Sequence, residues 1–213
     1  MDGNSDLQAR AEGGALTKGQ RTANRILDAA EELFAQNGYG ATSLRDIAAK
    51  VGVQQPGLYK HFAGKDELYR KVYERALQPM TNLMDEVLAR ADADFTDLTD
   101  RMTDLLAQHP NIARLLIRAA ISSDSEPDPI GLDWLGRMVG YGRKMNEKAG
   151  QPSSDDSLAM QIVAIFNMLF GFFWASPLIE SLSGRQATDP EAMAIQKGLL
   201  RGFIGSLSGT ART

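Results

Sequence analysis

Few side chains in this 213-residue sequence could do chemistry, and the richest group lies in the stretch GVQQPGLYKHF at residues 52–62. The chain has no Cys and only two histidines, His61 and His109, which excludes disulfides, thiolate nucleophiles and cysteine-ligated metals. Neither histidine has an acidic partner at catalytic spacing, so the parts for triad, metal or phosphoryl-transfer chemistry are missing. We therefore expect no enzyme, no catalytic residue, no metal and no cofactor. His109 is expected to end a helix or to line a pocket.

The stretch at 52–62 is typical of a short helix that presents its first turn to a partner. Pro56 is harmless near a helix start, where its missing N–H is not needed. Gly57 costs about 1 kcal/mol relative to Ala inside a helix, but it lets the backbone come close to another molecule. Leu58 and Phe62, four residues apart, form a narrow inward face. The side chains left on the outer face are Gln55, Pro56, Tyr59, Lys60 and His61.

The surrounding pattern predicts the helices that position this face. A first helix with apolar residues at helical spacing is expected to end at Asn37-Gly38, with the glycine as a left-handed cap. A short second helix follows, capped by Thr42 or Ser43 and ended by Gly52. A longer helix is expected from about residue 65 to 90. Two short helices joined by a Gly-containing turn, with a longer helix before them, form a helix-turn-helix.

The rest of the chain is also predicted to be helical, and no strand pattern or internal repeat appears, so the fold class is all-α. Pro177 is expected to end one long helix. The further expected segments are about 98–109, 111–123, 130–149, 154–176 and 189–208, with a breaker stretch at 122–129. The predicted organisation is a disordered leader at 1–17, a helix-turn-helix domain at 18–64, and a helical domain at 65–213.

Charge and hydropathy give weaker indications. The net charge is −4, yet residues 18–75 hold ten basic against seven acidic side chains, so a mildly basic front precedes an acidic body. No apolar run at the start reads as a signal peptide, and a cytoplasmic location is expected. The apolar run 158–176 is nearly long enough to span a membrane. Gln161 and Asn167 interrupt it and basic flanks are absent, so burial between helices or against a second subunit is favoured.

The segment TSLRDIAAKVGVQQPGLYKHFAGKDEL, residues 42–68, resembles the DNA-binding domain of the TetR family of bacterial transcription regulators. The likeness covers about residues 21–70. It implies a homodimer with two DNA-binding heads and a larger C-terminal domain that holds a small-molecule pocket. In such proteins a bound effector changes the separation of the heads and DNA is released. The heads would enter successive major grooves of a pseudo-palindromic operator, about 34–36 Å apart on double-stranded DNA.

The resemblance also implies roles for the outer-face residues, with a solvated surface as the alternative. Arg45 could read guanine and Gln55 adenine through paired hydrogen bonds in the major groove, while Pro56 could touch a thymine methyl. Lys60 stands at a position that varies across the family, which leaves the operator sequence open. Phosphate contacts, which set register without reading sequence, are expected from Ser43, Tyr59, His61 and Lys65. Lys18, Arg21 and Arg25 could add further phosphate contacts.

Candidates for the pocket are Met and aromatic side chains at helical spacing, which could equally be ordinary core. They are Trp134, Met138, Tyr141, Met145, Phe166, Asn167, Phe170 and Trp174. Asn167 interrupts an apolar run and needs a hydrogen-bond partner if buried, which could be a ligand, a neighbouring helix or a second subunit. These candidates suggest a hydrophobic or aromatic effector. By analogy with the family, the last two helices form the dimer interface, through Ile195, Leu199, Gly202 and Phe203; a monomer could bury the same stripe internally.

The sequence therefore predicts a ligand-responsive transcription regulator, a dimeric repressor that binds double-stranded DNA and a small molecule and has no membrane partner. One alternative is a helical architectural DNA-binding protein without an effector, which a compact domain without a pocket would favour. Another is a small-molecule-binding or membrane-associated helical bundle in which the front motif is structural. Absence of salt-sensitive DNA binding, or of dimerisation, would favour that reading.

Overall fold

The protein's structure, a computed structural model, describes residues 17–90, 92, 94–120, 129–148, 150 and 154–209. Every regular element in these ranges is a helix, as the all-α prediction requires. In chain order the helices are α2 (Lys18–Ala41), α3 (Leu44–Val51), α4 (Gln55–Leu58), α5 (Lys65–Ala89), α6 (Phe95–Gln108), α7 (Pro110–Ala120), α8 (Pro129–Lys148), α9 (Asp155–Trp174), α10 (Ser176–Ser183) and α11 (Pro190–Gly209). The expected leader lies outside the described residues apart from Thr17, which caps α2.

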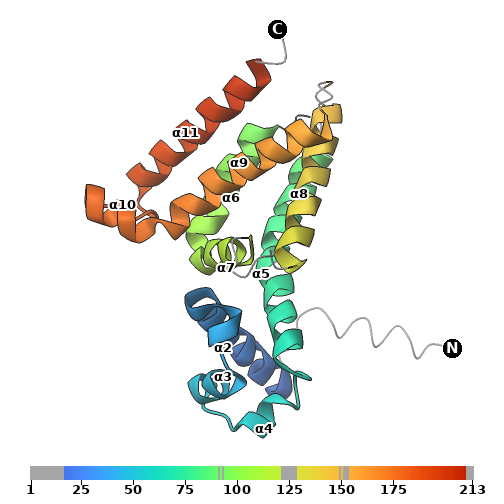
Figure 1. The fold of residues 1–213 in the computed structure, drawn as a ribbon, viewed down its shortest axis with the longest axis vertical. Helices are drawn as coiled ribbons and strands as arrows, with labels where there is room; N and C mark the ends of the chain where they lie inside the picture. The colour runs from blue at the N-terminus through green and yellow to red at the C-terminus, as the bar shows by residue number, and fades with distance from the viewer. Residues whose placement is uncertain are drawn as a thin grey trace, which may run out of the picture.

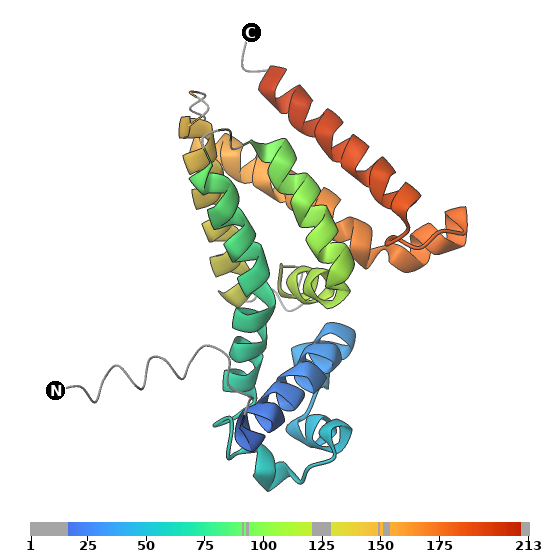
Figure 2. The ribbon, with the colours of Figure 1, turned by 180° about the vertical axis from the view of Figure 1, so that it is seen from behind.

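The helices divide into a small head and a larger body (Figures 1 and 2). The head consists of α2, α3 and α4. The body consists of α6 to α11 together with the second half of α5. Because α5 begins in the head and runs up into the body, it belongs to both parts. The N-terminal helix-turn-helix and the larger helical C-terminal domain expected from the sequence are both present.

The end of α2 differs from the expectation. Gly38 does have a positive φ of 82°, but its ψ of 171° is not that of a left-handed cap, and a short helical piece continues to Ala41 after the kink. Thr42 lies buried below this kink and donates its hydroxyl to the carbonyl oxygen of Gly38 at 2.8 Å. Thr42 is therefore tied to α2, and Ser43 is the residue that caps α3.

The apolar side chains of the helix-turn-helix form its buried core, as the predicted inward face of the third helix requires. Ile47, Ala48 and Val51 of α3 are buried, and so are Leu58 and Phe62 from the region of α4. The left-handed turn at Gly52, with φ 75° and ψ 34°, ends α3 as expected, and Pro56 stands in the first turn of α4. The two short helices are thus packed by one face each, which leaves the other face outside.

Helix α5 is fastened to the head by its first half. Arg75 forms ion pairs with Asp28 at 2.8 Å and with Glu31 at 3.0 Å, both on α2. Pro79 lies inside α5, where proline removes one backbone hydrogen bond and crowds the preceding turn. Beyond Pro79 the buried residues of α5 face the body, beginning with Met80.

One helix of the body was not expected. Pro177 was predicted to end the long apolar helix, but α9 already ends at Trp174 and a separate helix, α10, starts at Ser176 with Pro177 in its first turn. Proline suits a first turn as well as it stops a helix, so the same residue starts α10. Gly184, with φ 71°, then ends α10 in a left-handed turn.

The last helix, α11, lies along the outside of the body (Figure 2). Its buried Gln196 donates to the carbonyl oxygen of Met168 on α9 at 2.6 Å. Lys197 forms an ion pair with Asp104 of α6 at 2.6 Å. One face of α11 is therefore packed on α6 and α9.

Candidate nucleic-acid interface and apolar cavity

The outer face of α3 and α4 gathers the polar side chains that the sequence singled out. Arg45, Gln55, Pro56, Tyr59 and Lys60 are all exposed, and Tyr59 keeps 53% of its surface open. These helices form the tip of the head, at the end of the molecule farthest from α11 (Figure 1). Arg45 and Gln55 are thus exposed on two helices that pack against each other, α3 and α4.

Ser43 has a structural task besides any contact with DNA. Its hydroxyl donates to Oδ2 of Asp46 at 2.6 Å and accepts the backbone N–H of Asp46 at 3.1 Å, which completes a capping box at the start of α3. The hydrogen bonds from the Ser43 side chain and backbone lower the pKa of Asp46. The cap fixes the direction in which α3 leaves the turn.

Lys65 is half-buried and held in place by aromatic packing at the base of the head. Its ammonium group lies 4.1 Å from the ring centroid of Tyr39, a cation–π distance. The hydroxyl of Tyr39 donates to Asp66. His61 is also half-buried. Arg25, considered from the sequence as a further phosphate contact, donates to the carbonyl oxygen of Val51 at 2.6 Å, and so ties α2 to the end of α3.

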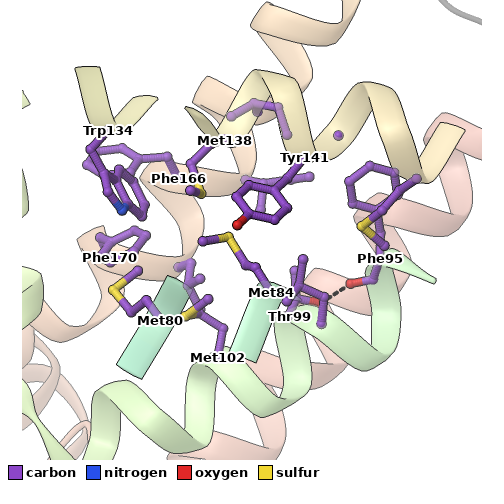
Figure 3. Close-up of a pocket in the computed structure, with 16 residues that line it drawn as sticks. Met80, Met84, Phe95, Thr99, Met102, Trp134, Met138, Tyr141, Phe166 and Phe170 are labelled. Carbon is purple, nitrogen blue, oxygen red and sulfur yellow. Dashed lines mark hydrogen bonds between the residues drawn. The ribbon is translucent and has the colours of Figure 1, made fainter. Parts of the chain in front are cut away.

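The body contains a partly open apolar cavity of about 60 Å³ between α5, α6, α8 and α9 (Figure 3). The structure places on its wall six of the residues proposed from the sequence: Trp134, Met138, Tyr141, Met145, Phe166 and Phe170. The other two do not line it. Asn167 and Trp174 lie on the exposed face of α9, and Trp174 keeps 56% of its surface open. That face points away from the cavity, because α9 buries its opposite side in the body.

Sequence reasoning missed the part of the wall that α5 and α6 supply, which includes Met80, Met84, Phe95, Thr99 and Met102. Their helical spacing is that of ordinary core residues, and only the packing of four helices shows that they surround a space. Five methionines line the cavity, and their unbranched side chains can adapt to an occupant.

Polar atoms on the cavity wall are few. The hydroxyl of Thr99 donates to the carbonyl oxygen of Phe95 at 2.9 Å, within its own helix. Tyr141 donates its hydroxyl to Asp85, and burial followed by the bond to that carboxylate raises the pKa of Tyr141 to about 12. The indole N–H of Trp134 is buried and has no hydrogen-bond partner in the described part of the chain.

The head also matches a known family. Residues 26–72 match the family model described as "Bacterial regulatory proteins, tetR family". This range runs from the middle of α2 through α3 and α4 into the first half of α5, which is the unit that carries the exposed polar face. Residues 26–72 therefore match the TetR family. The resemblance expected from residues 42–68 is therefore confirmed, and the TetR-family head is fused to a helical body.

One curated relative and two solved structures illustrate what the chain is similar to, and the structures show likeness of fold. The HTH-type transcriptional repressor Rv3405c of Mycobacterium tuberculosis is 34% identical over 122 residues, which are 49% of this chain and 63% of that protein. The match thus spans somewhat less than two thirds of that relative. The structure of the MbdR regulator from Azoarcus sp. CIB covers 84% of this chain at 24% identity, with 96% of its own chain matched and a TM-score of 0.63. A gamma-butyrolactone receptor described as ArpA-like covers 87% at 22% identity, with 97% of its chain matched and a TM-score of 0.59.

Helix α9 meets the length and composition of a membrane-crossing segment, but a third of its most apolar window is buried in the body. A core helix passes the same test, so this finding is weak support for the membrane-associated alternative. The exposed face of α9 carries Met160, Val163 and Trp174 with Asn167 among them. The helix is therefore apolar on its exposed side as well as on its buried side, with Asn167 as a polar interruption.

Proposed function

We propose that this chain is a ligand-responsive transcription regulator, a homodimeric repressor that a small hydrophobic or aromatic molecule releases from its operator. In this proposal residues 18–64 bind double-stranded DNA, and residues 65–213 bind the effector and form the dimer. The protein would act in the cytoplasm. The observation that carries it is the connection between two features. Helix α5 joins the TetR-like head, which has an exposed polar face, to the body, where the same helix lines an apolar cavity.

The exposure of the outer face supports the DNA-binding part. We propose that Arg45 and Gln55 read base edges and that Pro56 contacts a thymine methyl. We propose that Ser43, Tyr59, Lys60, His61 and Lys65 contribute phosphate or neighbouring contacts; Ser43, Tyr59 and Lys60 are exposed, and His61 and Lys65 are half-buried. The well-fixed positions of Ser43 and Lys65 suit that role, because a side chain already held in place loses little freedom on binding.

The homodimer is supported by apolar side chains left exposed on α11 and α9. Ile195 keeps 62% and Leu199 58% of their surface open, and they lie on one side of α11 with Gly202 and the half-buried Phe203. On α9 Met160, Val163, Asn167 and Trp174 form a second exposed stripe. Exposed apolar helix faces of this kind are what a second copy would cover in a two-fold interface. Asn167 would then find its hydrogen-bond partner in the other subunit.

The proposal predicts sequence-specific DNA binding that depends on salt. The first test titrates the full chain with the duplex that lies upstream of its own gene, beside a shuffled duplex of the same length, at two salt concentrations. A clear preference for the native duplex supports a self-regulating repressor. Equal and strongly salt-dependent affinity for both duplexes would point to phosphate contacts alone, as in an architectural protein. No binding to either would contradict the proposed function.

The dimer has its own test. Leu199→Glu places a charge in the centre of the α11 stripe and should convert a dimer into a monomer in sedimentation measurements. The control is Leu132→Glu, because Leu132 is similarly exposed at 51% but lies on α8, which is not part of the proposed interface. Loss of the dimer in both variants, or in neither, would refute the assignment of the interface. A wild-type monomer would refute the dimer itself.

A further inference from the structure

The wall of the cavity limits what can bind there. None of its sixteen lining residues carries a formal charge at neutral pH, so a bound ion would find no counter-charge on the wall. Moving an unpaired charge into such surroundings is very costly. Asp85 is not on the wall and already accepts the hydroxyl of Tyr141. The wall therefore favours an uncharged occupant.

One polar group on the wall is left for the occupant. Trp134 is 2% exposed, and its Nε1–H has no hydrogen-bond acceptor in the described part of the chain. Figure 3 shows the indole at one end of the cavity, beside Phe166 and Phe170. Phe170 stands edge-on to it at 5.5 Å between ring centroids, so the most it can offer is a weak N–H···π contact. Nearly all buried N–H groups have a stronger partner than this.

Water is a poor partner for this N–H. Buried water molecules usually make about three hydrogen bonds, and this wall offers few polar groups besides the indole. The other hydroxyl groups on the wall, those of Thr99 and Tyr141, already donate to a carbonyl and to a carboxylate. A ligand that is apolar over most of its surface and carries one acceptor oxygen fits better, because its oxygen pairs with the indole and the remainder meets the aromatic and methionine side chains.

We propose that the effector is an uncharged, mainly apolar molecule with a carbonyl-type oxygen, and that Trp134 Nε1–H selects it by donating a hydrogen bond to that oxygen. This inference rests on the proposed effector role of the cavity and names the ligand class. The cavity is small, about 60 Å³, so the occupant must push back flexible side chains. Met80 and Met84 of α5 are among them, which connects occupancy to the helix shared with the head.

The test compares acetophenone with α-methylstyrene, in which the carbonyl oxygen is replaced by a methylene group of similar shape. Both are titrated into the full wild-type protein by calorimetry, with benzoate as the charged analogue. Because a buried donor without an acceptor is costly, we expect acetophenone to bind about ten-fold more tightly than α-methylstyrene. Benzoate should bind far more weakly than either. In Trp134→Phe the preference for acetophenone over α-methylstyrene should disappear.

A spectroscopic measurement on the wild-type protein avoids dependence on the folding of that variant. The chain has two tryptophans, so a ¹⁵N-labelled sample gives two indole N–H signals. Acetophenone should move the Trp134 signal downfield and leave that of the exposed Trp174 in place, whereas α-methylstyrene should not produce the downfield shift. The inference is overturned by equal affinities for the two probes, by a preference that survives in Trp134→Phe, by tight benzoate binding, or by no binding of either neutral probe.

These outcomes are separate from those of the DNA titration, because ligand binding is measured without DNA. A protein that selects acetophenone through Trp134 but binds no duplex would keep the ligand inference and refute the repressor. A protein that binds its operator but neither neutral probe would keep the repressor and refute the ligand inference.

Discussion

Arg118 provides a direct contact between the body and the head, and its removal gives a quantitative test of how firmly the two are joined. From α7 its Nε donates to the carbonyl oxygen of Ala35 at 3.0 Å and its Nη2 to that of Gln36 at 2.6 Å. These carbonyls belong to the last regular turn of α2 before the kink at Gly38. Helix C-terminal carbonyls lack intrahelical partners and attract positive charge. The guanidinium supplies both the hydrogen-bond donors and the positive charge.

The magnitude follows from the two bonds and their exposure. Hydrogen bonds to charged groups contribute about 1.5–3 kcal/mol each when well shielded. The Arg118 side chain is exposed and water can replace it at the carbonyls, so we expect Arg118→Ala to lower the free energy of unfolding by about 1–2 kcal/mol in total. Arg118→Lys keeps the charge but cannot reach both carbonyls with a fork, and should fall between. If the same free energy is needed to hold the head in its DNA-binding orientation, operator affinity should drop by about 5–30-fold.

Urea unfolding and operator titration measure these two quantities in the same samples. Arg137→Ala is the matched control, because Arg137 is a surface arginine on α8 whose pair with Asp133 is an exposed i,i+4 contact. Such pairs contribute at most about 0.5 kcal/mol. The reasoning is refuted if Arg118→Ala unfolds like the wild type and binds the operator equally well, or if Arg137→Ala causes the same losses.

Other predictions concern the head and the cavity. Ser43→Ala removes the cap of α3 and should lower the free energy of unfolding in urea by about 1 kcal/mol; an unchanged midpoint would show that the capping box contributes nothing. Arg45→Ala should relax base preference at one operator position, whereas Lys65→Ala should weaken binding to all sequences and reduce the salt slope by about one; identical behaviour would refute the division into base and phosphate contacts. The pKa of Tyr141 is raised to about 12, so its contribution to stability is fully present below pH 10 and is lost as the pH rises toward 12. Tyr141→Phe should reduce the loss of stability in that range during alkaline unfolding, and a curve identical to the wild type would contradict this.

The helix boundaries could be predicted wherever a residue type allows one interpretation only. Gly52 ends α3 because the left-handed conformation there suits glycine, and the acidic first turn of α5 matches the positive end of its dipole. Pro177 allowed two interpretations, as the end of one helix or the first turn of the next. The choice depended on whether Ala175 turned the chain, which the sequence does not reveal. Gly38 was likewise identified as a break, but not as a kink followed by more helix.

The outer face of the head and the cavity of the body also differed in how far the sequence could predict them. The outer face of α3 and α4 was predictable because the inward residues of two short helices are few and define the remainder. The cavity was predictable only in part, because its wall combines four helices and the contribution of α5 and α6 depends on how they cross. Asn167, expected as a pocket residue, is exposed and does not line the cavity. A polar residue in an apolar run suggested a buried partner, yet α9 has an apolar outer stripe as well as an apolar core face.

Helix α2 packs against both α5 and α7, and two arginine contacts within this packing limit how the body can act on it. Arg75, on the first half of α5, holds the middle of α2 by two ion pairs, and Arg118, on α7, holds its C-terminal turn. Pro79 stands between Arg75 and the cavity-lining Met80, at a point where α5 lacks a backbone hydrogen bond. An occupant that displaces Met80 would therefore bend α5 at this weak point more readily than it would slide the whole helix. Because the α7 contact holds the other end of α2, such a bend would tilt the head and not simply translate it, and a tilt alters the distance between the two recognition faces of a dimer.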